Sequence, residues 1–206
     1  MVRTVLFDLA EVCLQGILGV EKVIAPVTGV VESEVRPNHL SGPHIYDFFR
    51  GRLSEEGYLQ RVMELGGYPE SVQGEPTLDF LKRAIRANFV PIPGTLDLVG
   101  RLAGRGLQIG LLSDHGREWI SYIEEQHTLD RVFEKRVYSF ETGFVKEEVE
   151  SFGVALRRLR ADPEETLFID DRAINLEVAR RAGIRHTYQF TDAKSLEAEL
   201  SKRGLL

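Results

Sequence analysis

Short apolar runs that alternate with helical patterns constrain the fold of this chain more than any other feature. In the second half each run is followed by a helical pattern, and a similar run opens the chain. The runs are 5–7, 107–112, 137–140, 166–169 and, more weakly, 185–190, and the helical patterns cover 95–104, 117–126, 147–160, 173–182 and 193–203. Runs without polar alternation are typical of strands buried on both faces, and helices supply the crossovers that parallel strands require. The sequence therefore predicts a doubly wound, mainly parallel α/β sheet.

The long segment after the first run follows a different pattern. Turn signals at 36–38 and 41–43 separate short helical stretches, Ser54 is placed to start a helix, and another helix is predicted over 78–87. We interpret this segment as a helical insertion that returns to the sheet near Phe89. The predicted division is a Rossmann-like core, residues 1–13 and 89–206, and a helical insertion, residues 14–88.

Charge and cysteine content argue against several classes of partner. The formal net charge of -6 gives no basic surface for a nucleic acid backbone, so we expect no nucleic acid partner. The single cysteine, Cys13, excludes an internal disulfide and fits a reducing cytosol. Asp8 and Glu11 interrupt the apolar start, which we therefore assign to the mature fold, and no run approaches the ~20 residues that span a bilayer. We expect a cytoplasmic protein with no membrane partner, either a monomer or a weak dimer.

Polar side chains follow four of the predicted strands at the point where each strand ends. Asp8 follows the first run, Ser113 the second, and Asp170 with Asp171 the fourth, while Lys146 lies in the turn after the third. Because ligands bind outside the carboxyl ends of parallel strands, we expect these side chains at one edge of the sheet. Three carboxylates, one hydroxyl and one ammonium at one place indicate a metal and phosphate site.

Each of these residues also has a plain structural interpretation. An aspartate after a strand is often a cap or turn former, so Ser113 with Asp114 could cap the helix predicted from 117, and Asp171 the one predicted from 173. Lys146 could start a solvated helix. Independent caps have no reason to place this chemical set at one edge in this order, so the joint pattern favours a site. Oxygen ligands suit Mg²⁺, and a carboxylate such as Asp8 can attack phosphorus while an ammonium neutralises phosphoryl charge.

Four segments resemble the four motifs of the haloacid dehalogenase superfamily of Mg²⁺-dependent phosphohydrolases, and the resemblance covers nearly the whole chain. In chain order they read VLFDLAEV, GLLSD, SFETGFVK and FIDDRAINLEVARRAGI, of which the last is highly specific. The resemblance implies Asp8 as nucleophile, Ser113, Asp114 and Lys146 at the phosphate, and Asp8, the Ala10 carbonyl, Asp170 and Asp171 around Mg²⁺. The insertion resembles a C1 cap, and FFRGRLSEEGY is similar to a cap stretch of sugar-phosphate phosphatases, with the α-D-glucose-1-phosphate phosphatase type as the nearest likeness.

The chain departs from the superfamily pattern at two positions. Ala10 stands where the superfamily usually carries the aspartate that protonates the leaving alkoxide, and an alanine cannot transfer a proton. General acid catalysis contributes ~10² to 10⁴ in rate, so a slow or inactive enzyme is an open alternative. Glu11 and His115 are candidates to replace the acid. Glu147 stands where proline is usual, which we expect to affect only the turn.

The other histidines and arginines are weaker indications. His39 and His44 in the insertion could reach over the site, but for each of them and for His115 a surface or loop position is the simpler expectation. Arg50 and Arg52 could meet substrate or could end a solvated helix. We assign a further group to structure or core: His127, His186, Trp119 and Cys13.

The function that we expect is Mg²⁺-dependent hydrolysis of a small phosphorylated metabolite, with a sugar phosphate as one candidate. One alternative is a catalytically weak metabolite-binding protein that keeps the metal and phosphate site. Another is a phosphotransferase or mutase, which would depend on an acceptor. A metal-free dehalogenase is less favoured, because Asp170 and Asp171 would recruit the divalent metal that such a site has to exclude.

Overall fold

The computed structural model describes residues 1–35 and 43–206. The predicted turn at 36–38, His39 and part of the predicted turn at 41–43 lie outside the described residues. Five parallel strands form the main sheet in the order β7-β6-β1-β8-β9. In that order their bounds are Lys135–Tyr138, Gln108–Ser113, Thr4–Phe7, Thr166–Asp170 and His186–Gln189. The doubly wound parallel sheet that the sequence predicts is confirmed.

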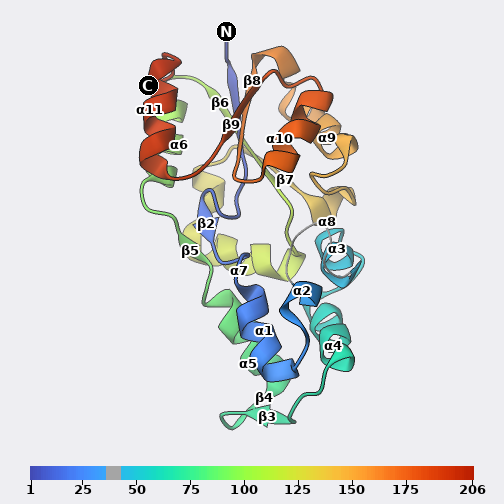
Figure 1. The fold of residues 1–206 in the computed structure, drawn as a ribbon. Helices are drawn as coiled ribbons and strands as arrows, with labels where there is room; N and C mark the ends of the chain where they lie inside the picture. The colour runs from blue at the N-terminus through green and yellow to red at the C-terminus, as the bar shows by residue number, and fades with distance from the viewer. Residues whose placement is uncertain (36–42) are drawn as a thin grey trace.

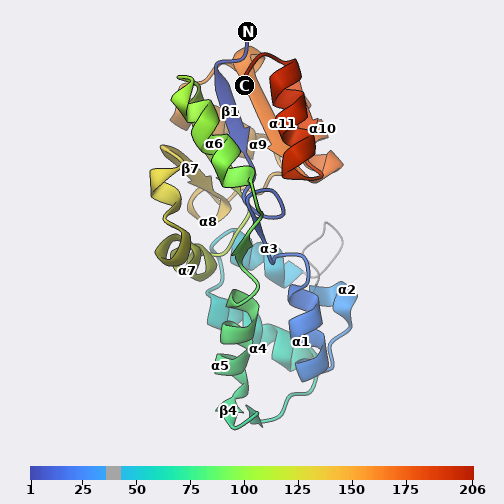
Figure 2. The same cartoon turned by 90° about the vertical axis from the view of Figure 1, so that its left-hand side faces the viewer.

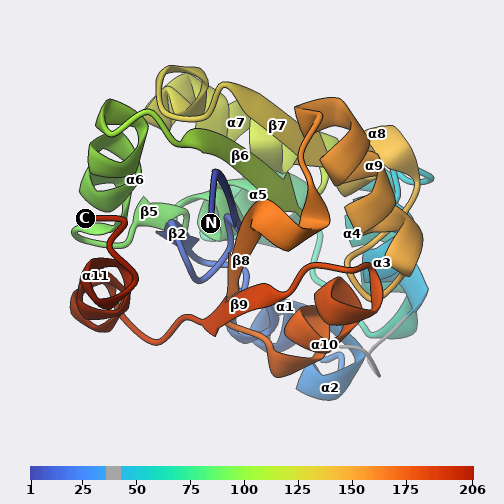
Figure 3. The same cartoon turned by 90° about the horizontal axis from the view of Figure 1, so that it is seen from above.

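Helices cover both faces of this sheet, with α6 and α11 on one face and α9 and α10 on the other (Figure 3). The bounds of these helices and of two short 3-10 turns are α6 Thr95–Gly104, α9 Val149–Leu159, α10 Ala173–Arg181, α11 Ala193–Lys202, η1 Leu129–Arg131 and η2 Pro163–Glu165. Val5 and Phe7 of β1 pack into the core beneath α6 and α11, whereas Leu6 packs into the core beneath α9 and α10. Because side chains alternate along a strand, a strand covered on both sides is apolar throughout.

The third strand ends earlier than the sequence predicts. The run at 137–140 was expected to be a strand, but β7 ends at Tyr138 and the next residues form the short helix α8, Ser139–Thr142. The reason is a contact between segments far apart in the chain, since the Ser139 hydroxyl donates to the Phe49 carbonyl at 2.6 Å and accepts from the His115 amide at 3.0 Å. The helix predicted over 147–160 is likewise shorter and begins at Val149.

The helical insertion lies at the carboxyl ends of the strands, and both chain termini lie at the opposite end of the molecule (Figures 1 and 2). It contains α1 Val20–Thr28, α2 Glu32–Val35, α3 Pro43–Phe49, α4 Glu55–Leu65, α5 Thr77–Arg86 and a small hairpin, β3 Ser71–Val72 with β4 Glu75–Pro76. Ser54 caps α4 by accepting from the Gly57 amide, as the sequence predicts. The chain enters and leaves through the antiparallel pair β2 Leu14–Gln15 and β5 Val90–Pro91. Across both described segments, the helices are too short or too polar to cross a membrane.

An aromatic cluster joins the insertion to the core at α7, Arg117–His127. Phe48 of α3 stacks on Tyr58 of α4 with ring centroids 5.4 Å apart and meets the edge of Trp119 of α7 at 4.8 Å. A Cβ on Gly116 would lie 1.8 Å from the Phe48 ring, so this approach requires glycine. The buried carboxylate of Glu55 accepts from Trp119 Nε1 at 2.8 Å and also pairs with Arg86 of α5. These contacts hold the insertion against the edge of the sheet where the predicted site lies.

Candidate active site

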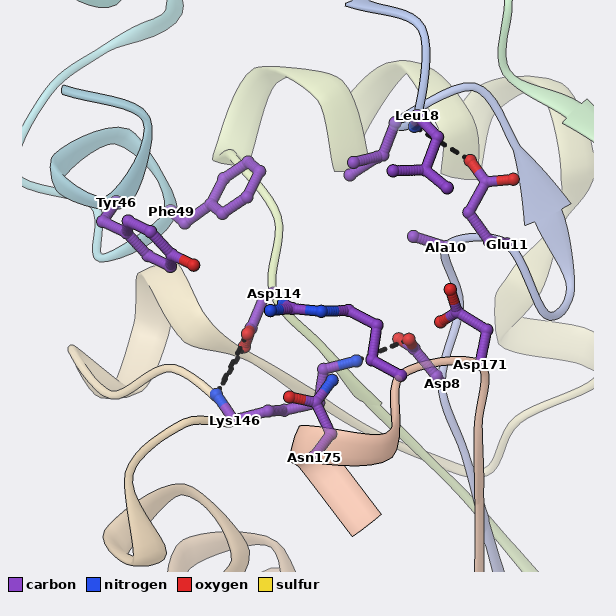
Figure 4. A pocket seen from close by; sticks show the side chains of 12 residues that line it. Asp8, Ala10, Glu11, Leu18, Tyr46, Phe49, Asp114, Lys146, Asp171 and Asn175 are labelled. Atoms are coloured by element: carbon purple, nitrogen blue, oxygen red, sulfur yellow. Dashed lines mark hydrogen bonds and ion pairs between the residues drawn. The ribbon is translucent and has the colours of Figure 1, made fainter. Parts of the chain in front are cut away.

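The ends of β1 and β8 bring two buried carboxylates to one buried ammonium. Asp8 directly follows β1, Asp170 is the last residue of β8, and the two strands are paired neighbours. Lys146, in the segment after α8, places its Nζ 2.5 Å from Asp8 Oδ2 (Figure 4). The same Nζ lies 2.8 Å from Asp170 Oδ2. All three side chains are at most 4% exposed, so the interpretation of Lys146 as the start of a solvated helix is wrong.

Asp171 completes a group of three carboxylates with Asp8 and Asp170. One carboxylate oxygen of each lies within 4.8 Å of the others. Burial raises the pKa of Asp8 well above its usual range, and the neighbouring carboxylates add to this against the lowering effect of Lys146. Burial, followed by the charge of Asp170, raises the pKa of Asp171 to about 6. Burial lowers the pKa of Lys146, but the surrounding carboxylates outweigh it and keep the ammonium protonated.

Three carboxylates against one ammonium leave an excess of two negative charges when all are ionised. A divalent cation with oxygen ligands would balance this excess, and the donor set is of the kind that Mg²⁺ takes in proteins. The chemistry of the donors therefore fits the metal that the sequence predicts.

The start of α10 fixes the orientation of Asp170. Asn175 Nδ2 donates to both carboxylate oxygens at 3.0 Å, and the Arg172 amide donates to Oδ1 at 2.8 Å. The Asn175 side chain is fully buried, and its Oδ1 has no hydrogen-bond partner within the described ranges. Asp171 does not cap α10, contrary to its plain structural interpretation, because the helix begins without a side-chain cap.

The end of β6 supplies Ser113 and Asp114. Both carboxylate oxygens of Asp114 accept from the Lys146 amide, at 3.1 and 3.0 Å, so this side chain anchors the segment that carries the lysine. Burial raises the pKa of Asp114 to about 6, although the charge of Lys146 opposes this. Neither residue caps α7, which has Gly116 at its start and no side-chain cap. Ser113 is fully buried, and its hydroxyl has no partner among the described residues.

These residues lie around a small cavity of about 40 Å³, which has room for a water molecule but not for a metabolite. Its floor, at the sheet edge, is charged and amide-bearing: Asp8, Asp114, Lys146, Asp171, Arg172 and Asn175. Its wall comes from the segment after β1 and from α3: Ala10, Glu11, Ile17, Leu18, Tyr46 and Phe49. Two predicted site residues do not line it, Ser113 at the end of β6 and Asp170 at the end of β8, and both are fully buried.

The two candidate replacements for the missing acid are differently placed. Glu11 lines the cavity, but its Oε1 accepts from the Gly16 and Leu18 amides, each at 3.0 Å, and so closes the loop that it belongs to. His115 does not line the cavity and is buried among the rings of Phe49, Phe89 and Trp119. Burial, followed by the charge of Lys146, lowers the pKa of His115 to about 3. His115 lies in the loop between β6 and α7, one of the two expected positions, but it is buried and not on the surface, and its imidazole is neutral at neutral pH.

The other singled-out residues lie away from the cavity. His44 is half-buried, and Arg50 and Arg52 form ion pairs with Glu148 and Asp47, at 3.0 and 3.1 Å. His127 contacts the Phe89 carbonyl through Nε2 at 3.0 Å. The structural role expected of His127 and the core positions of Trp119 and Cys13 are confirmed.

Glu147 links the wall to the floor, a role that its sequence position does not predict. Its Oε1 accepts from the Tyr46 hydroxyl and from the Arg172 guanidinium, both at 2.9 Å. The expectation that this residue affects only the turn is wrong. The adjacent Glu148 accepts from the Val145 amide and pairs with Arg50, so two consecutive carboxylates hold α3 to the segment of Lys146. The signal available in the sequence was the pair of acidic residues in place of proline.

Comparison with known proteins identifies the family. The family model of haloacid dehalogenase-like hydrolases matches residues 2–183. The chain is 29% identical over 165 residues to acyl-CoA dehydrogenase family member 10 of Mus musculus, covering 78% of this chain and 15% of that protein. It is 25% identical over 163 residues to flavin mononucleotide hydrolase 1 of Arabidopsis thaliana, covering 79% of this chain and 63% of that protein. The chain thus spans less than two thirds of the length of either relative.

Solved structures share the fold. A HAD family enzyme from Bacteroides thetaiotaomicron, in complex with magnesium and inorganic phosphate, matches with a TM-score of 0.75 at 23% identity, over 93% of this chain and 96% of that one. A HAD-like family hydrolase from Porphyromonas gingivalis matches with a TM-score of 0.78 at 23% identity, over 98% of each chain. L-2-haloacid dehalogenase from Xanthobacter autotrophicus matches with a TM-score of 0.63 at 15% identity, over 100% of this chain and 85% of that one. With the family model spanning most of its length, the chain belongs to the haloacid dehalogenase-like hydrolases.

Proposed function

We propose that this hydrolase is a Mg²⁺-dependent phosphatase that acts on a small phosphorylated metabolite through an aspartyl-phosphate on Asp8. The observation that carries the proposal is the buried contact of Lys146 Nζ with Asp8 and Asp170 beside a third carboxylate. It joins a nucleophile, a cation for phosphoryl oxygens and a set of metal ligands in one place. The Arabidopsis relative is named a flavin mononucleotide hydrolase, which supports phosphate ester chemistry.

The residues proposed to hold Mg²⁺ are Asp8, Asp170, Asp171 and the backbone carbonyl of Ala10. The charge excess of the three carboxylates and the raised pKa values of Asp8 and Asp171 support this assignment. When bound, the metal supplies positive charge that stabilises the transferring phosphoryl group. The structural neighbour from Bacteroides thetaiotaomicron was solved with magnesium and inorganic phosphate, which supports the proposal that this site binds Mg²⁺ together with a phosphoryl group.

In the proposed reaction a carboxylate oxygen of Asp8 attacks phosphorus, and the bond from phosphorus to the leaving oxygen breaks. The Lys146 ammonium neutralises charge on the phosphoryl oxygens, and the Ser113 hydroxyl, which has no partner among the described residues, is proposed to donate to one of them. Asn175 acts on Asp170, whose carboxylate it holds through Nδ2. Asp114 keeps Lys146 in position through its amide. Water then attacks the aspartyl-phosphate, which releases phosphate and restores the Asp8 carboxylate.

The helical insertion serves, in this proposal, as a cap. It provides the wall of the cavity and excludes water while the phosphoryl group is transferred. Because the cavity holds no more than a small group, substrate has to enter through movement of the insertion or of the residues around it. A cytoplasmic location and a monomer or weak dimer stay predictions.

A second candidate is a metabolite-binding protein with little turnover. Ala10 favours it, since no acid stands at the position where the superfamily pattern carries one. A dehalogenase is disfavoured by the three clustered carboxylates, and the likeness to L-2-haloacid dehalogenase is one of fold.

The test is phosphate release from phosphate monoesters with Mg²⁺ and with EDTA. Turnover that is lost in EDTA and restored by excess Mg²⁺ supports the phosphatase. Turnover that chelation leaves unchanged contradicts the metal assignment. If no ester is hydrolysed but inorganic phosphate raises the melting temperature only when Mg²⁺ is present, the protein is the binding protein instead.

A further inference from the structure

We propose, on the basis of the phosphatase function above, that the site prefers phosphate esters whose leaving group is flat, apolar and weakly basic, such as aryl or enol phosphates. The inference replaces the sugar phosphate that the sequence resemblance suggests. It rests on two separate observations, the chemistry of the cavity wall and the contacts that already engage Glu11, Tyr46, Asp114 and Arg172.

The wall of the cavity is apolar where it faces the charged floor. Figure 4 shows the rings of Tyr46 and Phe49 on one side and the side chains of Leu18 and Ala10 on the other, with the carboxylate of Asp114 between them and Asp8 below Ala10. A phosphoryl group bound on the floor at Asp8 directs its leaving group between these two sides. Two rings opposite an aliphatic side chain form a slot that suits a planar apolar group.

Two polar groups of the wall are already engaged. The Tyr46 hydroxyl donates to Glu147, and Arg172 of the floor donates to the same carboxylate oxygen. Glu11 Oε1 holds two backbone amides of its own loop. The hydroxyl groups of a sugar would lose water on entering this slot and would find few partners among the described wall residues. Buried polar groups without partners are costly, whereas an aromatic group has none to satisfy.

The described residues around the cavity place no acid at the leaving group, and this points to the same class of substrate. Ala10 has no proton to give, Glu11 is engaged in its loop, and both oxygens of Asp114 accept from the Lys146 amide. The leaving oxygen therefore departs with the electron pair of its bond to phosphorus as an oxyanion, and it takes a proton from water afterwards. Aryl and enol oxyanions are far less basic than sugar alkoxides, so they leave more readily without an acid.

The experiment compares matched esters on the Mg²⁺-loaded protein, with kcat and KM measured separately. Phenyl and cyclohexyl phosphate are similar in size but differ in flatness and leaving-group basicity, 2-naphthyl phosphate extends the flat surface, and glucose 1-phosphate and glucose 6-phosphate represent sugars. We expect kcat/KM of the aryl esters to exceed that of the sugar esters by ~10² or more, and 2-naphthyl phosphate to have a lower KM than phenyl phosphate. Sugar esters that match the aryl esters would overturn the inference but leave the phosphatase intact, whereas no hydrolysis of any ester would overturn the phosphatase.

A pair of leucine variants tests the wall itself. Leu18 lines the cavity and is 54% exposed, and Leu65 at the end of α4 is 55% exposed and lies away from the cavity. Leu18→Asn should raise the KM for 2-naphthyl phosphate about fivefold, the effect of losing one or two buried CH₂ contacts, while Leu65→Asn should not. Equal KM values in the two variants would show that the leaving group does not contact this wall. The inhibition constant of inorganic phosphate, which should stay the same in both, reports that the floor is intact.

Discussion

The floor and the wall of the cavity are built in opposite ways. The floor consists mostly of charged side chains at or near strand ends, and two of them, Asp8 and Lys146, are almost fully buried and in direct contact with each other, while Lys146 also contacts Asp170 beneath them. The wall consists of apolar and aromatic side chains from a loop and from α3, and one of them, Leu18, is largely exposed. The sheet topology fixes the floor, because adjacent parallel strands end at one edge. The wall depends on how the helical insertion docks, which leaves the choice of substrate to that region.

The largest expected effect comes from a substitution in the floor that leaves the wall unchanged. Asp8→Asn should lower kcat by at least ~10³, because an amide cannot form the aspartyl-phosphate. The measurement is phosphate release from 2-naphthyl phosphate, with the exposed Asp130→Asn as control. Activity near that of the unchanged protein would remove Asp8 from the role of nucleophile. A folded Asp8→Asn protein that still binds the ester would show that floor and wall act separately.

The second prediction concerns a substitution that adds the missing proton donor beside the floor. Ala10 lines the cavity beside the leaving-group side, so Ala10→Asp places a carboxyl group where the superfamily pattern has one. Turnover of alkyl and sugar phosphates should rise by up to ~10², while turnover of aryl phosphates should change little, because aryl oxides leave without protonation. Both substrates are measured on both proteins. An equal response of the two substrate classes would mean that another group already supplies the proton.

The sequence predicts the floor well for a physical reason. Each buried apolar run ends in a polar residue, and parallel pairing alone brings Asp8, Ser113 and Asp170 to one edge. Helix α6 also has the predicted bounds, since Leu98, Val99 and Leu102 share one buried face. What the sequence predicts here depends on local pattern and on the topology of parallel strands, and neither requires knowledge of distant contacts.

The wall and its link to the floor could not be predicted, because they depend on contacts between segments far apart in the chain. The bond of Tyr46 to Glu147 joins residues 101 positions apart, and the strand after 137 ends early because Ser139 bonds the carbonyl of Phe49. His115 is followed by a glycine in a loop-like sequence, yet it is buried, because Phe49 of the insertion covers it together with Phe89 and Trp119. In each case the docking of the insertion overrides the local pattern.

The third prediction concerns the boundary between insertion and core, where His115 is buried. Its folded pKa is about 3, so between pH 6.5 and about 3 the unfolded chain binds a proton that the folded chain does not. Stability should therefore fall with decreasing pH, with His115 contributing a slope of about 1.4 kcal/mol per pH unit below its unfolded pKa. The raised pKa values of Asp114 and Asp171 act in the opposite direction, because protonation near pH 6 favours the folded form.

The difference in the free energy of unfolding between the unchanged protein and His115→Asn separates the contribution of the histidine from that of these carboxylates. The free energy of unfolding of each is measured by urea titration from pH 7.5 to 4.5. At pH 7.5 the difference gives the packing cost of the substitution, since the imidazole is neutral in both states. We expect the variant to lose less stability per pH unit as the pH falls. Parallel curves would show that His115 titrates in the folded protein much as it does in the unfolded chain.

The smallest expected effect lies at the link between wall and floor. Glu147→Gln keeps a carbonyl oxygen for the Tyr46 hydroxyl but removes the charge that pairs with Arg172. The pair is about one-quarter exposed on each side, so its loss is worth about 1 kcal/mol, roughly fivefold in affinity. If Glu147 positions the wall, KM for 2-naphthyl phosphate should rise by that factor while kcat stays within twofold. If it positions Lys146 instead, kcat should fall and KM should stay, which would contradict the separation of wall from floor. Glu150→Gln, an exposed change in the first turn of α9, is the matched control and should alter neither constant.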